Sequence, residues 1–146
     1  MKDLLIKEDA AIQYTSLPVI KGDKDQLKVL FRNIILNALA NKRKEEKLLV
    51  DVNASQMPSE EIENMQLPQT HNYYKITITD NGTGFSNADA KSVFKPFFRL
   101  QPKTPYSIHG LELAICKNIA ENHEGKIYAL SNENIGTQII IILPFK

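Results

Sequence analysis

Three asparagines, Asn33, Asn37 and Asn41, recur at every fourth residue in the first third of the sequence. On a helix, such side chains present amide oxygens along one face. Mg²⁺ prefers oxygen ligands and often takes only one or two from protein, the rest coming from phosphates and water. The spacing therefore indicates a candidate site for a hydrated cation. The alternative is structural, since asparagines at the edge of a core need backbone partners for their buried amides.

A second candidate is Asp80-Asn81-Gly82-Thr83-Gly84, which directly follows an alternating apolar segment. Asn-Gly is a strong hairpin signal, so a tight turn is one interpretation. The following residues do not resume a strand pattern, however, and two glycines spaced two apart let the backbone approach a flat ligand closely. A lone carboxylate at this place can accept a hydrogen bond from an exocyclic amine such as that of adenine.

Cations and a glycine in the third quarter of the chain offer a possible anion site. Lys95, Arg99 and Lys103 lie at fourfold spacing in a proline-rich segment, where they are either solvated surface or phosphate contacts. Gly110 stands just before a helical pattern, where unpaired N–H groups favour an anion, although any loop-to-helix junction can carry a glycine. The three histidines are scattered and form neither a metal cluster nor a hydrolytic triad pattern, which disfavours nucleophilic hydrolysis.

Composition limits the classes of protein to consider. The chain has 146 residues, 42% hydrophobic and 24% charged, which is the size of one domain with a proper core. The net charge of +1 gives no bulk attraction to nucleic acid or anionic lipid. The longest apolar run, IIIIL, is too short to span a membrane, and the single Cys116 excludes an internal disulfide. We expect a soluble cytoplasmic fragment that neither inserts into a membrane nor binds nucleic acid.

The elements that must position these residues follow from periodicity. A helix is predicted from an N-cap at Asp23, with Gln26 completing a capping box, to residues 41–43. A polar stretch at 53–72 is interpreted as an exposed loop or hairpin tip without a chemical role. The other predicted elements are strands within 11–20 and at 48–52, 73–79, 126–130 and 138–143, a short helix at 87–93, and a helix at 111–123 closed by Gly125. This order predicts an α+β two-layer sandwich with a mixed, mainly antiparallel sheet covered on one face by helices.

The motifs, taken in order, resemble the catalytic, ATP-binding domain of sensor histidine kinases in the GHKL superfamily. The matching segments are NIILNALAN for the N box, DNGTGF for the G1 box, VFKPFFRL for the F box, HGLELAICKNIAENHEGKI for the G2 box, and the final GTQIIIILP. The resemblance covers residues 11–145, and residues 1–10 are interpreted as a remnant of an upstream linker helix before a domain at 11–146.

The resemblance implies ATP and Mg²⁺ as cofactors and a role for each matching residue. Asn37 would be the Mg²⁺ ligand and catalytic asparagine, and Asp80 would bind the adenine amine. Arg99 would lie in an ATP lid running from Lys95 to His109. The remaining cofactor-binding residues would be Asn33 near the phosphates, Gly82 and Gly84 at the purine, Thr137 assisting, and Gly110 with Leu111 offering backbone N–H groups.

The sequence departs from the family pattern at two places. Ala40 and Asn41 stand where the N box usually has a lysine and an aromatic residue, so a phosphate-facing lysine is missing unless Lys42 or Arg43 substitutes. The G2 box has Ile108 and Glu112 where glycines are usual. These departures leave open whether the domain turns over ATP.

The implied function is transfer of the ATP γ-phosphoryl group to a histidine on a separate dimerisation and phosphoacceptor domain, which would serve a response regulator indirectly. No residue of this chain matches the acceptor histidine, so the isolated domain is not expected to autophosphorylate. Two alternatives remain: a degenerate, non-catalytic GHKL module that binds a protein partner, and a gyrase- or chaperone-type ATPase, which is disfavoured because those usually carry an acidic residue where Asn33 stands. Whether the parent chain is membrane-anchored stays open.

Overall fold

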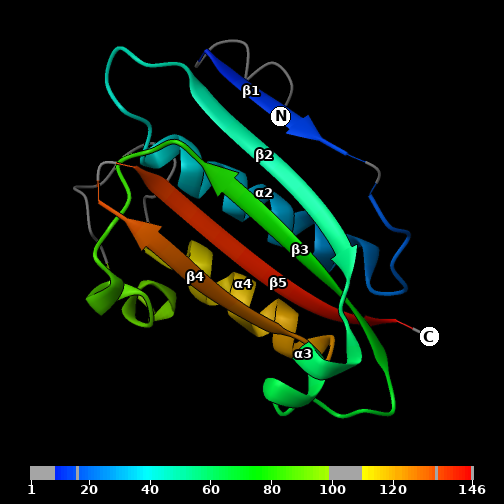
Figure 1. The fold of residues 1–146 in the computed structure, drawn as a ribbon. Helices are drawn as coiled ribbons and strands as arrows, with labels where there is room; N and C mark the ends of the chain where they lie inside the picture. The colour runs from blue at the N-terminus through cyan, green and yellow to red at the C-terminus, as the bar shows by residue number, and fades with distance from the viewer. Residues whose placement is uncertain (1–8, 16, 99–109, 134, 146) are drawn as a thin grey trace.

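The computed structural model describes residues 9–15, 17–98, 110–133 and 135–145. A five-stranded sheet forms one layer, and the two long helices α2 and α4 lie side by side on one of its faces (Figure 1). The elements in chain order are β1 (Ala10–Tyr14), α2 (Lys24–Ala40), β2 (Leu48–Gln56), α3 (Ser59–Asn64), β3 (Asn72–Asp80), η1 (Asn87–Asp89), η2 (Ser92–Phe94), α4 (Glu112–Asn122), β4 (Lys126–Asn132) and β5 (Gly136–Phe145).

The sheet has the strand order β1-β2-β3-β5-β4. β1 pairs with β2 in parallel, and the other three pairings are antiparallel. The predicted α+β class with a mixed, mainly antiparallel sheet is therefore confirmed. Ala10 already belongs to β1, and residues 1–8 of the expected linker remnant lie outside the described residues.

The main core lies between the sheet and the two long helices. Alternate residues of the central strands, such as Ile76 and Ile78 of β3, point to the helices and are 2% exposed each. Leu30 of α2 and Cys116 of α4 meet at the centre of this layer, where the Cys116 thiol lies 3.5 Å from the Leu30 carbonyl oxygen. Burial raises the pKa of Cys116 to about 12, so its thiol stays protonated and acts as a packing group.

The start of α2 is tied to the end of α4. The Asp23 side chain caps the helix as predicted, accepting from the Gln26 backbone N–H at 3.0 Å. The second half of the capping box does not form, because the Asp23 N–H donates instead to Nε2 of His123, also at 3.0 Å. Gln26 Oε1 is buried and has no hydrogen-bond partner among the described residues. A contact across 100 residues thus replaces the local one that the sequence favours.

The segment at 53–72, predicted as an exposed loop or hairpin tip, does join the antiparallel strands β2 and β3, but it is not an exposed loop. β2 extends to Gln56, α3 follows, and the segment folds against the opposite face of the sheet, where α3 lies in front of the strands in Figure 1. Ion pairing between Lys75 and Glu61, at 2.6 Å, fixes it there. The second core that results joins three residues of this segment to three of the sheet: Met57, Ile62 and Leu67 with Tyr73, Ile140 and Ile142.

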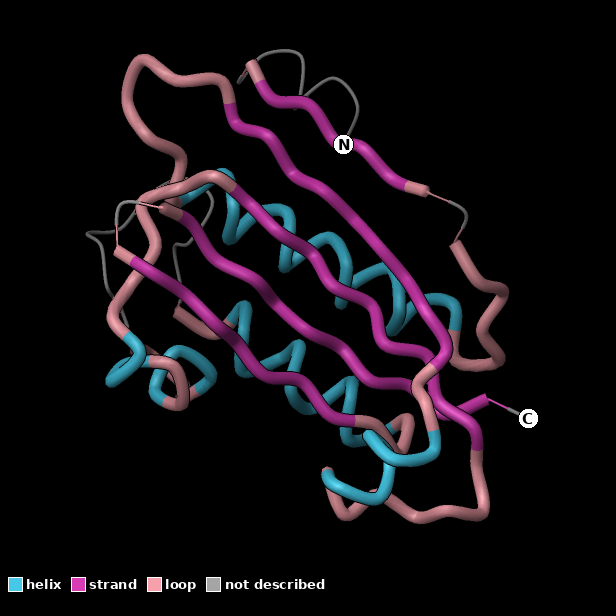
Figure 2. The backbone as a smooth tube through the Cα atoms, in the orientation of Figure 1, coloured by secondary structure: helices cyan, strands magenta, loops and turns pink. Residues whose placement is uncertain are grey.

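Smaller differences concern the ends of elements. The predicted helix at 87–93 is two short 3₁₀ helices, η1 and η2 (Figure 2). At the end of α4 the left-handed residue is Glu124, with φ 59°, and not Gly125, whose N–H bonds to the Ala120 carbonyl at 2.8 Å. No helix in the described part of the chain is long and apolar enough to cross a membrane.

Candidate functional site

Asp80 is the last residue of β3 and continues the row of side chains that faces the helices. It is only 7% exposed. Its carboxylate accepts a hydrogen bond from the Gly82 backbone N–H at 2.9 Å. Burial raises the pKa of Asp80 to about 6, while backbone hydrogen bonds from Gly82 and Thr137 and the charge of Arg43 hold it lower than burial alone would. Above that pH the site presents a buried, partly satisfied carboxylate that can accept a donor from a ligand.

The glycines of the turn after Asp80 are required by neighbouring backbone. A Cβ on Gly82 would lie 2.6 Å from the Asn41 carbonyl oxygen and 3.0 Å from Asp80 Oδ1. Gly84 has φ +67°, and a Cβ there would lie 2.1 Å from the Asn132 carbonyl oxygen. Both glycines therefore shape the surroundings of Asp80 by allowing the turn to press against α2 on one side and the β4–β5 turn on the other.

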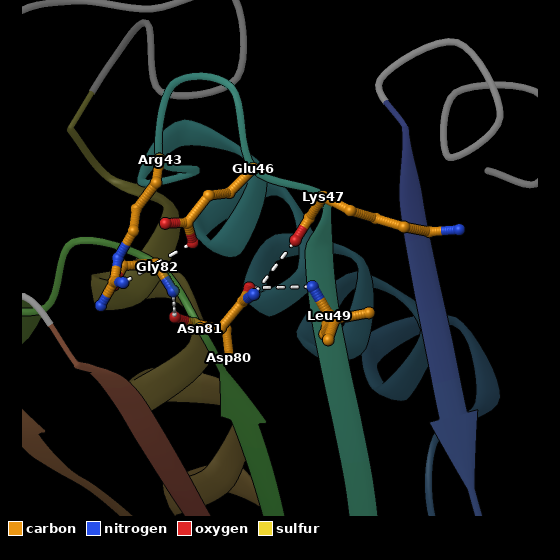
Figure 3. Close-up of polar contacts among 7 residues, drawn as sticks. All are labelled: Arg43, Glu46, Lys47, Leu49, Asp80, Asn81 and Gly82. Carbon is orange, nitrogen blue, oxygen red and sulfur yellow. Dashed lines mark hydrogen bonds and ion pairs between the residues drawn. The ribbon is translucent and has the colours of Figure 1, made fainter.

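The residues just after α2 hold this turn in place. The Thr83 N–H donates to the Asn41 carbonyl at 2.9 Å, and Arg43 Nε donates to the Gly82 carbonyl at 3.1 Å (Figure 3). Arg43 also pairs with Glu46, with Nη1 3.6 Å from Oε2. Arg43, considered above as a substitute for a phosphate-facing lysine, thus contacts the turn and biases Asp80 towards its charged form.

Asn81 anchors the same turn from the other side. Its side-chain Oδ1 accepts from the Leu49 N–H at 2.8 Å, and its Nδ2 donates to the Lys47 carbonyl at 3.0 Å (Figure 3). The side chain therefore points away from the helices and towards the start of β2. Asp80 and Asn81, adjacent in sequence, serve opposite purposes: one side chain faces the candidate site and the other fixes the backbone behind it.

The three helical asparagines separate into two kinds. Asn33 is 8% exposed, and its Nδ2 donates to the Glu112 carbonyl at 3.4 Å. Asn41 Nδ2 donates to the Asn37 carbonyl at 2.9 Å. In the described part of the chain, the half-buried side-chain amide of Asn37 makes no hydrogen bond, so its oxygen is available to a ligand. The structural interpretation thus fits Asn33 and Asn41, and the ligand interpretation fits Asn37.

Thr137 stands opposite Asp80 in the β3–β5 ladder and is 4% exposed. Its hydroxyl lies 3.0 Å from that of Ser131. Ser131 gives its only proton to the Gly136 carbonyl and accepts from the Phe85 N–H, both at 2.8 Å, so Thr137 must donate to Ser131. Ser131 thereby links the turn after β3 to the β4–β5 turn. No motif in the sequence marked Ser131, because its partners are 46 and 5 residues away.

The other end of the site is the start of α4. Gly110 has φ +68°, and its carbonyl accepts from the Phe97 N–H at 2.7 Å. Leu111 is the N-cap residue and makes no side-chain capping bond, and Glu112 lies in the first turn. The hydrogen bond from the Asn33 side chain to the Glu112 carbonyl joins this junction to α2. Arg99, Ile108 and the rest of the expected lid from 99 to 109 lie outside the described residues.

A hollow of about 640 Å³ also reaches the Asp80 end of the sheet. It is lined by side chains such as Leu49, Thr79 and Gln138, which alternate along their strands with core residues and so belong to the outer face of the sheet. Asp80, Ser131 and Thr137 also line it, but Asn33 and Asn37 do not. The candidate site lies on the helix-covered face, which carries Asp80 at the end of β3, Asn37 on α2 and the start of α4.

Fold and site together define an ATP-binding domain of the GHKL type. Residues 22–146 match the family model described as histidine kinase-, DNA gyrase B-, and HSP90-like ATPase, and the chain belongs to this family. The resemblance to the ATP-binding domain of sensor histidine kinases is thereby confirmed.

Three proteins illustrate what the chain is similar to. Sensor protein RprX of Bacteroides fragilis is 33% identical over 129 residues, which cover 87% of this chain and 22% of RprX. The mycobacterial sensor histidine kinase MprB aligns with a TM-score of 0.73 at 24% identity, over 98% of this chain and 93% of that structure. Full-length ShkA in complex with AMPPNP aligns with a TM-score of 0.72 at 19% identity, over 97% of this chain and 27% of that structure. The chain thus spans about a fifth of RprX.

Proposed function

We propose that this chain is the catalytic domain of a two-component sensor histidine kinase. It binds ATP and transfers the γ-phosphoryl group to a histidine on a separate dimerisation and phosphoacceptor domain, which then serves a response regulator. The observation that carries this proposal is the buried Asp80 carboxylate beside a turn that is anchored from both sides. Family membership and the likeness to ShkA, which was solved with an ATP analogue, support the choice of nucleotide.

Asp80 is suited to recognise adenine. The exocyclic amine of adenine is a hydrogen-bond donor, and a carboxylate is an acceptor without protons of its own above its pKa. Because Asp80 is buried, water competes weakly for that bond, and a base without the amine would leave a buried charge unpaired. The anchored turn keeps the carboxylate in place before the nucleotide arrives, and Thr137 faces it across the ladder.

Asn37 is suited to hold Mg²⁺. Its side-chain oxygen is half-buried on a rigid helix, and within the described residues no other group uses it. The donor chemistry fits, because Mg²⁺ accepts a single amide oxygen and completes its shell with phosphate oxygens and water. When bound, the ion would neutralise phosphate charge. Asn33 supports this arrangement by tying the middle of α2 to the first turn of α4, where Gly110 and Leu111 offer backbone N–H groups to phosphate.

Titration calorimetry with ADP and with an ATP analogue, each with and without Mg²⁺, tests the binding part of the proposal. We expect binding of both nucleotides, and a gain from Mg²⁺ that Asn37→Ala removes. Asn41→Ala is the matched control, since that amide already bonds to the Asn37 carbonyl. Absence of binding at millimolar nucleotide would overturn the proposal.

Radiolabelled ATP tests the transfer part. The isolated chain should stay unlabelled, and a phosphoacceptor hairpin from the parent protein, supplied in trans, should gain an acid-labile phosphohistidine. Nucleotide binding without any transfer to the hairpin would instead support the non-catalytic alternative, in which Glu112 and Ile108 have eroded the phosphate side. Acid-stable label on the isolated chain would contradict both.

A further inference from the structure

A groove of about 880 Å³ runs beside α2 from Lys24 to Ile35. One wall is the segment that leads from β1 into α2, represented by Ile20 and Gly22, and the other is the helix surface from Lys24 to Ile35. Figure 1 shows this segment at the end of α2 opposite to the end that meets the turn after β3. Among the described residues, none that is assigned to the nucleotide lines this groove, which we call the α2 groove, so it is a separate feature.

The floor of the α2 groove is apolar. Leu27 and Phe31, one helical turn apart, are half-buried there, as is Ile20 from the opposite wall. The segment that forms this wall carries two further exposed apolar side chains, Leu17 at 48% and Val19 at 96% exposure. Neither of them lines the groove itself. Single exposed apolar residues are ordinary, but two of them in the segment that leads to an apolar groove enlarge the apolar surface that a partner could cover.

A row of cations borders this floor. Lys24, Lys28 and Arg32 stand at i, i+4 and i+8, all are exposed, and in the described part of the chain none of them forms an ion pair. Like charges at this spacing repel one another on a helix. Lys24, as the first residue of α2, also lies at the positive end of the helix dipole, where a cation is unfavourable. Asp23 and Asp25 lie near this end, but neither lines the groove.

The arrangement suits one kind of occupant. A helix lying along the groove could place an apolar stripe on Leu27 and Phe31 while acidic side chains on its flank face the cations. The cations repeat every four residues, about 6 Å along the axis, which is the spacing of glutamates at i and i+4 on a second helix. Such a partner would relieve both the repulsion within the row and the unfavourable charge at the helix end.

We propose that the α2 groove docks an amphipathic helix of a partner protein or domain, in which a row of acidic side chains flanks an apolar stripe. The proposal does not depend on nucleotide binding, because the groove and the candidate site share no residue.

The test is a charge exchange. Two synthetic amphipathic helices of about five turns carry the same leucine stripe and differ only in a flanking row of glutamates or lysines. Each is titrated into the isotope-labelled chain and followed by amide chemical shifts. The acidic peptide should shift amides around Leu27 and Phe31, and the basic peptide should not. In the variant K24E/K28E/R32E the preference should reverse, with affinity for the acidic peptide falling about tenfold or more.

The matched control is K44E/K91E/K117E, which changes the net charge equally at exposed positions outside the groove. It should keep the preference for the acidic peptide. Both triple variants should bind ADP like the wild type, which verifies that they fold. Equal binding of the two peptides, unchanged binding in K24E/K28E/R32E, or shifts confined to other elements would overturn the proposal. Binding of phosphatidylglycerol vesicles at these amides without binding of the acidic peptide would overturn it in favour of a lipid surface.

Discussion

The two ends of the candidate site differ in how firmly their backbone is held. At the Asp80 end, the Thr83 N–H donates to the Asn41 carbonyl and Arg43 donates to the Gly82 carbonyl. The Asn81 side chain bonds to the backbone of Lys47 and Leu49, and the Asp80 carboxylate accepts from the Gly82 N–H. At the start of α4, the described contacts are the bond from Phe97 to Gly110 and the 3.4 Å bond from Asn33 to Glu112. Leu111 has no side-chain cap.

This difference separates two kinds of recognition. A base is read by a few directional bonds, which require a fixed acceptor, and the Asp80 turn provides one. Phosphates are held by charge and by backbone N–H groups at a helix start. At the start of α4 this chain carries Glu112, whose carboxylate is attracted to the positive end of the helix dipole, as a phosphate would be. The same carboxylate repels phosphate. The predictions below test this contrast, from the largest expected effect to the smallest.

The largest effect concerns the cost of burying Asp80. Its pKa is about 6 in the folded chain against 3.8 ordinarily, so folding favours the protonated form. The raised pKa adds to the free energy of unfolding, and this contribution is fully present below pH 4 and is lost as the pH rises through 6. The loss amounts to about 3 kcal/mol. Asp80→Asn should remove most of this dependence and make the nucleotide-free chain more stable at pH 7.5. Urea unfolding at pH 4 and 7.5 measures it, and parallel curves for variant and wild type would sink the idea.

The second prediction concerns nucleotide binding by the same variant. Asp80→Asn should weaken ADP by about 2 kcal/mol, roughly 30-fold, because an amide is a poorer acceptor for the adenine amine. Wild-type binding should also weaken as pH falls through about 6, and the variant should lose that dependence. Asp51→Asn, an exposed acid on the outer face, is the control and should bind normally. Equal affinities for Asp80→Asn and Asp51→Asn would remove the adenine role.

The third prediction concerns the anchor of the turn. Arg43→Met should weaken ADP by about 1 kcal/mol, because Gly82 loses a hydrogen bond that positions the N–H bound to Asp80. It should also move the pH midpoint of ADP binding upward, since the Arg43 charge lowers the pKa of Asp80. Arg43→Lys keeps the charge, so it should restore the pH midpoint of ADP binding more fully than it restores the affinity for ADP. Lys44→Met serves as control, and a midpoint unaffected by Arg43→Met would show that Arg43 is only structural.

The smallest effect concerns the phosphate end. Glu112→Gln keeps a helix-compatible side chain and removes one negative charge from the first turn of α4. It should tighten ATP relative to adenosine by about 0.5 kcal/mol, roughly twofold. Glu121 is exposed and lies later on the same helix, so Glu121→Gln should leave the ratio of ATP affinity to adenosine affinity unchanged. Calorimetry with ATP and adenosine on the three proteins decides it, and an unaltered ratio in Glu112→Gln would mean that its carboxylate points to solvent.

Much of the fold could be predicted because its signals are local. The stripe along α2, the alternation in β3 and the Asp23 cap all depend on residues within a few positions of one another. The helix and second core within 53–72 could not be predicted, because Met57, Ile62 and Leu67 are isolated apolar residues in a polar stretch. Their burial depends on Tyr73, Ile140 and Ile142, which lie on strands distant in sequence.

The same distinction holds for the candidate site. The sequence by itself determined its residue types, since the spacing of the asparagines and the Asp-Asn-Gly-Thr-Gly turn mark positions where an acceptor and an oxygen ligand can stand. Only the tertiary structure decided how each is used. The Asn33 side chain bonds to a residue 79 positions away and the Arg43 side chain to one 39 positions away, whereas the Asn37 side chain bonds to none of the described residues. The reason is physical: a polar side chain binds whatever the packed chain brings within about 3 Å of it, and periodicity specifies the face it occupies but not the neighbour it meets.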